Sequence, residues 1–252
     1  MYKIPANTLF TGQRLVFVPE CHSTNSLASE LATQSILSEG TVVITSHQTA
    51  GRGQRGNSWE TAAGMNLTFS ILVKPAFLSI KNQFYLTMIT SLAVTDFLKE
   101  QSVADVKIKW PNDILVGKNK ICGILIENSI QKEVIQHSIV GIGLNINQHN
   151  FSTPTATSLA NVTGESFDLN ESLNLLLEKF EKKYLQLRSE KLAELKSEYS
   201  ENLYGRGERR TFVSNGKEFE GRIEQVNENG ELVVSVTNER RNYNLQEISF
   251  VL

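Results

Sequence analysis

The stretch Val106–Glu127, VKIKWPNDILVGKNKICGILIE, decides the fold class, because it has the pattern of several short strands in succession. Pro111, Gly117 and Gly123 interrupt its apolar runs, and such residues are typical of strand ends and tight turns. A second run, EVIQHSIVGIGLNI at residues 133–146, follows after a short polar gap. Together the two runs predict adjacent antiparallel strands in the middle of the chain.

Further strands and helices are predicted on both sides of this region. Apolar stripes at helical spacing indicate helices that bury one face against a sheet. The sequence therefore predicts an α+β fold, in which helices back a mixed or antiparallel sheet. The expected strands cover residues 14–19, 41–48 and 66–73, and the expected helices follow Ser23-Thr24-Asn25 and cover residues 82–101 and about 170–202.

The residue pattern changes after Gly205, where short runs of alternating polar and apolar residues surround Asn215-Gly216 and Asn229-Gly230. Asn-Gly between alternating runs is a strong hairpin signal. We expect two domains, a large one over residues 1–206 and a small SH3-like β-barrel over residues 207–252.

Composition narrows the function classes. The 252 residues carry a net charge of −2 with both signs spread along the chain, so nothing indicates DNA binding. No run approaches the roughly 18 apolar residues that a membrane span needs. Cys21 and Cys122 lie far apart and near no histidine cluster, which argues against a disulfide framework and a metal site. We expect a cytoplasmic protein without membrane contact.

The glycine-rich segment GRGQRG, residues 51–56, matches the pattern GxGxxG of dinucleotide-binding loops. Such a loop must open a helix and have an acidic residue some 20 positions later. Here a strand follows instead, and residues 61–95 contain no Asp or Glu. The segment is predicted to be a loop between strands, and Arg52 and Arg55 suit carboxylate or phosphate oxygens. An ordinary exposed hairpin with two surface arginines is the alternative.

Five ordered segments resemble the biotin protein ligase family: STN, QTAGRGQRGNSW, KWPND, KICGILIE and GIGLNIN, within residues 23–147. The resemblance implies a class II aminoacyl-tRNA-synthetase-like catalytic domain with helices on one face of a mixed sheet, and an SH3-like C-terminal domain. It also implies that biotin and ATP, with Mg²⁺, form biotinyl-5′-AMP, and that a lysine of a biotin carboxyl carrier domain then receives the biotin. The family's N-terminal DNA-binding domain is expected to be missing. Whether the protein is a monomer or a homodimer stays open.

The resemblance also assigns roles to residues. Lys109 and Arg52 match the cations that offset repulsion between the biotin carboxylate and the α-phosphate, and are the expected catalytic residues. The residues expected to bind biotin are Ser23, Thr24, Asn25, Gln48, Gly51, Arg52, Gly53, Gln54, Lys109 and Gly123. Those expected to bind ATP or the adenylate are Arg52, Arg55, Trp59, Lys109, Asn112, Lys120 and Asn145.

Several of these residues also have plain structural interpretations. Ser23 suits a helix N-cap, Trp59 suits an anchor for the loop, and Gly123 suits a β-bulge. The chain departs from many relatives at Gln54 and Asn57, where arginines are common. Two cationic contacts to the adenylate that many relatives have are therefore expected to be absent.

Two other functions remain open. A lipoate or other acyl-group ligase would use the same adenylation, although Thr24 and Gln48 favour the polar ureido ring of biotin over a dithiolane. A non-catalytic module that binds a small molecule or a carrier protein is the alternative from another class.

Overall fold

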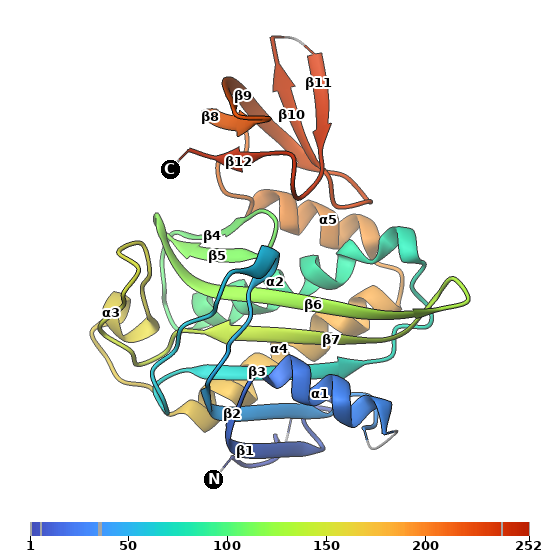
Figure 1. Cartoon of the computed structure of the whole chain (residues 1–252), viewed down its shortest axis with the longest axis vertical. Helices are drawn as coiled ribbons and strands as arrows, with labels where there is room; N and C mark the ends of the chain where they lie inside the picture. The colour runs from blue at the N-terminus through green and yellow to red at the C-terminus, as the bar shows by residue number, and fades with distance from the viewer. Residues whose placement is uncertain (1, 6, 35–36, 238, 252) are drawn as a thin grey trace.

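A seven-stranded sheet forms the centre of the large domain (Figure 1). The computed structural model describes residues 2–5, 7–34, 37–237 and 239–251, with Arg55 described in its backbone only. The strands of this sheet are β1 (Leu15–Cys21), β2 (Val42–Gln48), β3 (Leu67–Val73), β4 (Val106–Lys109), β5 (Asp113–Val116), β6 (Asn119–Gln131) and β7 (Val134–Leu144). They confirm the strands expected from the sequence.

The sheet is mixed, with the strand order β1-β2-β3-β7-β6-β5-β4. Only β1 and β2 pair in parallel, and each further neighbouring pair is antiparallel. The two β-rich runs become the antiparallel strands β4 to β7, as predicted. In the long β6–β7 pair, Gly123 lies opposite Gly143, which leaves no side chain on either strand at that point.

Helices cover both faces of the sheet, so the expectation of helices on one face only was incomplete. The large apolar core lies between the sheet and the helices α2 and α4. A smaller cluster packs α1 on the opposite face, formed by Ala28, Leu37, Val43, Leu72 and Ile139. The helices are α1 (Thr24–Thr33), α2 (Phe84–Glu100), α3 (Leu159–Thr163), α4 (Leu169–Arg188) and α5 (Leu192–Glu201), with short 3-10 turns at Gln54–Gly56 and Ile80–Asn82.

A second, five-stranded antiparallel sheet forms the C-terminal region, at the top of Figure 1. Its strands are β8 (Arg209–Ser214), β9 (Lys217–Val226), β10 (Leu232–Val236), β11 (Glu239–Tyr243) and β12 (Ser249–Phe250). Asn215 and Gly216 form the predicted two-residue turn between β8 and β9, both with positive φ. This small sheet agrees with the predicted SH3-like domain.

The C-terminal sheet is attached to the large domain beside the end of β4. The indole nitrogen of Trp110 donates a hydrogen bond of 2.9 Å to the carbonyl of Gly230, in the β9–β10 turn. A Cβ at Gly230 would come within 2.5 Å of the Phe84 ring, so only glycine fits this close approach. The β9–β10 turn is therefore fitted tightly against α2.

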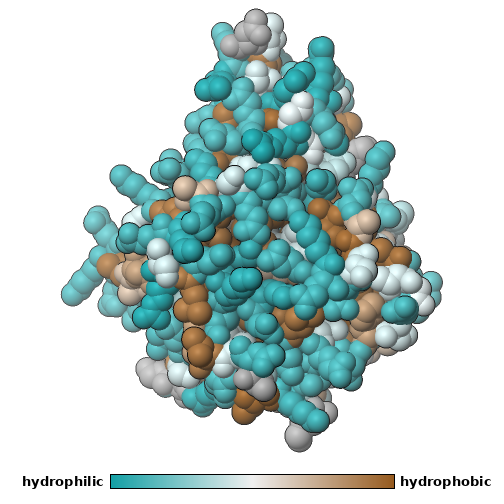
Figure 2. Space-filling model, turned by 180° about the vertical axis from the view of Figure 1, so that it is seen from behind, coloured by the Kyte–Doolittle hydropathy of each residue, from teal (hydrophilic) through white to brown (hydrophobic). Residues whose placement is uncertain are grey.

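The surface seen from the side of α2 and α4 is mostly hydrophilic (Figure 2). Apolar residues show there only as separate patches among polar ones. In the part of the chain that the structure describes, no helix is both long and apolar enough to cross a membrane. Cys21 and Cys122 are both free thiols.

Candidate active site

A pocket of about 280 Å³ opens on the α1 side of the sheet. The glycine-rich loop after β2 forms one wall, and the N-terminus of α1 another. Strands β6 and β7 form its floor, while the end of β4 and residues 248–250 of the C-terminal sheet close the far side. The expected site residues that line it are Ser23, Thr24, Asn25, Gln48, Arg52, Gly53, Gln54, Trp59, Lys109, Asn112, Lys120 and Gly123.

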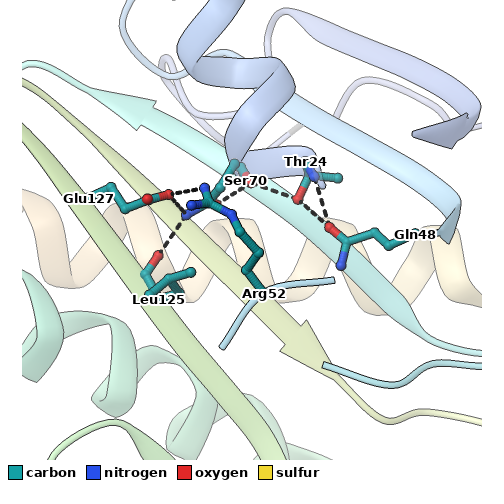
Figure 3. A network of polar contacts seen from close by, with 7 residues as sticks. Thr24, Gln48, Arg52, Ser70, Leu125 and Glu127 are labelled. Atoms are coloured by element: carbon teal, nitrogen blue, oxygen red, sulfur yellow. Dashed lines mark hydrogen bonds and ion pairs between the residues drawn. The ribbon is translucent and has the colours of Figure 1, made fainter. Parts of the chain in front are cut away.

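At the α1 end of the pocket, polar side chains form a connected network (Figure 3). The backbone N–H of Thr24 donates to the Gln48 side-chain oxygen at 2.8 Å, and the Thr24 hydroxyl lies 3.3 Å from the same oxygen. The hydroxyl of Ser70, fully buried in β3, donates to the Asn25 oxygen at 2.6 Å and lies at hydrogen-bond distance, 2.7 Å, from the hydroxyl of Thr24. These contacts hold the side chains of Thr24, Asn25 and Gln48 in place.

Ser23 occupies the N-cap position of α1 with extended backbone angles, but its side chain makes no capping hydrogen bond. The oxygen of Gln48 instead satisfies the first helical N–H, that of Thr24. Ser23 is buried and lines the pocket. Its hydroxyl is therefore not used as the helix cap that the sequence also allowed.

Arg52 reaches from the loop to Glu127 on β6 (Figure 3). Its guanidinium pairs with the Glu127 carboxylate at 2.8 Å, and the Asn25 amide donates to the same carboxylate oxygen at 2.8 Å. Both charged side chains are substantially exposed, so the pair alone contributes about 0 to 1 kcal/mol. Arg52 is thus held beside the site by a weak and exchangeable contact.

The middle of the pocket has a floor of glycines under the indole of Trp59. A Cβ at Gly143 would lie 2.3 Å from the Trp59 ring, and one at Gly123 would lie 2.9 Å from it. A third glycine, Gly141, leaves room for the side chain of Asn25 in the same way, since a Cβ there would lie 2.2 Å from the Asn25 oxygen. The indole N–H of Trp59 is buried without a partner among the described residues. Gly123 therefore makes room for the Trp59 ring, and it is not the β-bulge that the sequence also allowed.

At the β4 end, two lysines bring positive charge to the pocket. The Lys109 ammonium lies 5.6 Å from the centre of the Phe250 ring and makes no hydrogen bond or ion pair with a described residue. Burial lowers the pKa of Lys109, the Asp113 carboxylate raises it, and the Lys120 ammonium lowers it. Lys120 itself pairs with Asp113 at 2.7 Å and lies 5.4 Å from the centre of a Trp59 ring. Among the described side chains that line the pocket, Lys109 is therefore the cation without an ion pair.

Three expected residues do not line the pocket as described. Asn145 is buried, and its amide donates to the Thr157 carbonyl at 2.9 Å. The backbone N–H of Thr157 donates in turn to the carbonyl of Lys120. Asn145 therefore holds the segment around Thr157 in place beside Lys120. Gly51 supports the loop, because a Cβ there would lie 2.4 Å from the Trp59 carbonyl. The side chain of Arg55 lies outside the described part of the structure.

Sequence reasoning missed several residues of this site. Ser70 and Glu127 complete the polar network, and Gly141 and Gly143 extend the floor. The alternate glycines of GIG were a visible signal of a strand without side chains on one face. Phe250 could not be found in this way, because nothing in the sequence places β12 against β4.

The family model described as "Biotin/lipoate A/B protein ligase family" matches residues 18–145. The biotin--[acetyl-CoA-carboxylase] ligase of Mycobacterium tuberculosis is 30% identical over 89% of this chain and 84% of its own length. The bifunctional ligase/repressor BirA of Bacillus subtilis is 34% identical over 69% of this chain. The chain spans 54% of that protein's length.

A solved structure of biotin protein ligase from Aquifex aeolicus, in complex with biotin and ATP, has a TM-score of 0.80 and 26% identity. It covers 95% of this chain and 99% of the Aquifex chain, so the similarity includes the small C-terminal sheet. The matched residues 18–145 contain the polar network, the glycine floor and both pocket lysines. The chain belongs to the biotin/lipoate A/B protein ligase family.

Proposed function

We propose that this protein is an ATP-dependent biotin protein ligase. One observation carries the proposal: a single pocket joins hydrogen-bonded polar side chains at the α1 end to an available lysine at the β4 end. A ligand with a small polar ring, an apolar arm and a carboxylate matches this order of chemistry. The names of the Mycobacterium and Aquifex relatives support biotin as that ligand.

The α1 end suits the ureido ring of biotin, which has one carbonyl acceptor and two N–H donors. Ser23 and Thr24 offer hydroxyls and Gln48 offers an amide, and these groups both donate and accept. Asn25 holds the network from below and also contacts Glu127. The glycine floor with Trp59 on it then borders the space for the apolar arm, and Gly53 and Gln54 of the loop line the same pocket, while Gly51 lets the loop pass close to Trp59.

The β4 end suits the first chemical step. The biotin carboxylate attacks the α-phosphorus of ATP, a C–O–P linkage forms, and pyrophosphate leaves. Two anions must meet, so a preorganised cation such as Lys109 lowers the barrier. Arg52 is the second such cation, once it exchanges Glu127 for the phosphate. Lys120 and Asn112 border the same space and complete the adenylate site, with Arg55 as a further proposed contact.

In the second step, the amine of a carrier lysine attacks the acyl carbon and AMP leaves. No side chain of this protein needs to become covalently attached, because substrate carboxylate and carrier amine act in turn as nucleophiles. The carrier is a biotin carboxyl carrier domain. Magnesium would be supplied with ATP, bound to the oxygens of its phosphates.

Other parts of the proposal concern the protein as a whole. Residues 1–206 form the catalytic domain, and residues 207–252 form the SH3-like domain. Asn145 does not line the pocket, and it supports the part that would bind adenosine by holding the segment around Thr157. The protein acts in the cytoplasm without DNA, as a monomer or a homodimer.

The decisive experiment incubates the protein with biotin, labelled ATP and a biotin carboxyl carrier domain. Pyrophosphate release and labelling of the carrier are expected together. A parallel reaction with lipoate, in which the adenylate is trapped, tests the alternative ligase of the same family. Preferential formation of lipoyl-adenylate would replace biotin as the substrate. Binding of biotin with neither product would leave only the non-catalytic binding module.

A further inference from the structure

The C-terminal sheet contributes directly to the pocket, through residues 248–250. Phe250 ends β12, which pairs with β8 by the register Phe250 to Phe212. The Phe250 ring also packs edge-on against the Phe212 ring, with 5.4 Å between the ring centres. One side of Phe250 is thus held by its own sheet, while the ring lies 5.6 Å from the ammonium of Lys109.

The distance between Lys109 and Phe250 is within the range of a cation–π contact, for which about 6 Å to the ring centre is the usual limit. Such a contact favours the charged form of the lysine and a defined position for it. The Lys109 ammonium makes no other described contact of hydrogen-bond or ion-pair length, so the ring is the contact that locates it. Asp113 and Lys120 are the charged groups nearest to it from β5 and β6.

Trp110, the residue after Lys109, holds the C-terminal sheet close to the end of β4. Trp110 follows Lys109 directly and donates to the carbonyl of Gly230 at 2.9 Å. Gly230 in turn fits against Phe84 of α2 with no room for a side chain. The end of β4 therefore touches the C-terminal sheet at two separate places, the β9–β10 turn and β12.

We propose that Phe250 is a positioning residue for adenylation, whose ring holds the ammonium of Lys109 in the pocket. The inference rests on the proposed function, because the role of Lys109 in adenylation belongs to it. Phe250 does not touch the reacting atoms. It acts through Lys109, and it makes the small C-terminal sheet part of the adenylation site.

The test compares Phe250→Leu, Phe250→Tyr and Phe219→Leu by pyrophosphate release with biotin and ATP. Leucine keeps apolar bulk beside Lys109 but removes the aromatic face, while tyrosine keeps the face. Phe219→Leu is the matched control, because Phe219 stacks on the same Phe212 ring at 5.7 Å and does not line the pocket. We expect kcat/KM to fall about fivefold in Phe250→Leu, the scale of one partly buried cation–π contact. Phe250→Tyr and Phe219→Leu stay near the parent.

The pH profile of kcat/KM provides a second readout, because it reports groups in the free enzyme. Burial already lowers the pKa of Lys109, and loss of the aromatic face lowers it further. The ammonium is needed charged, so the alkaline limb of Phe250→Leu moves to lower pH. An unchanged limb and unchanged kcat/KM overturn the proposal, as does an equal loss in Phe219→Leu. A parent protein that releases no pyrophosphate instead overturns the proposed function.

Discussion

At the α1 end of the pocket the polar side chains of the network hydrogen-bond with one another, whereas at the β4 end the Lys109 ammonium makes no ion pair with a described residue. The first arrangement keeps Thr24 and Gln48 in position at little cost, because their hydrogen bonds exist before the ligand binds. The arrangement at the β4 end leaves the Lys109 ammonium able to pair with an anionic substrate group. Under the proposed function, the α1 end recognises biotin and the β4 end carries out the adenylation.

Removing the charge at the β4 end has the largest expected effect. We expect Lys109→Ala to lower kcat for adenylation by about two to three orders of magnitude, the scale for one preorganised charge stabiliser. The KM for biotin should change little, because the α1 end is intact. Pyrophosphate release measures both. Lys107→Ala is the control, since it removes the same charge from β4 without lining the pocket. Unchanged turnover in Lys109→Ala would remove this lysine from the mechanism.

A change at the α1 end should give the opposite kinetic pattern. Thr24→Val removes one hydroxyl at nearly constant volume and leaves Ser70 without one of its hydrogen-bond partners. We expect the KM for biotin to rise about tenfold with kcat nearly unchanged, as for uniform binding. Thr33→Val at the far end of α1 is the control. A loss of kcat with constant KM would contradict the division between the two ends.

The smallest expected effect concerns the exposed pair between the two ends. Arg52→Gly should release bound biotinyl-adenylate about threefold to fivefold faster, because one exposed charge contact contributes about 1 kcal/mol or less. Glu127→Gln frees Arg52 but keeps it on the loop, so retention should match the parent. Rapid filtration of the enzyme with labelled adenylate measures the release. Equal retention in Arg52→Gly and the parent would show that Arg52 does not hold the phosphate.

Local patterns predicted most of the fold. Strand alternation, Asn-Gly turns and helical stripes depend on neighbours within a few residues, and the strands β1 to β7 and the turn at Asn215-Gly216 appear where they were expected. The position of α1 on the opposite face from α2 was not predicted. It depends on Val43 and Leu72 pointing away from the main core, which the unbroken apolar run of β3 conceals.

Site residues that belong to a local sequence motif were predicted. Those that belong to the site only through contacts with distant parts of the chain were missed. Lys109, Thr24 and Gln48 lie in the pocket as expected. Glu127 meets Arg52 across 75 positions of the chain, and Ser70 meets Thr24 across 46. No local pattern specifies such pairs, because they follow from the order of strands in the sheet.

The absence of side chains at Gly123 and Gly143 also makes these residues useful reporters. Both lie under the Trp59 indole, so its ring current should displace their amide proton resonances. Gly164 and Gly216, with nothing near their Cβ positions, would serve as internal references in a sample labelled with ¹⁵N only at its 16 glycines. A ligand that moves the indole would change the first two signals and leave the references in place. The amide signals of the pocket floor would thus report movement of the loop that carries Trp59.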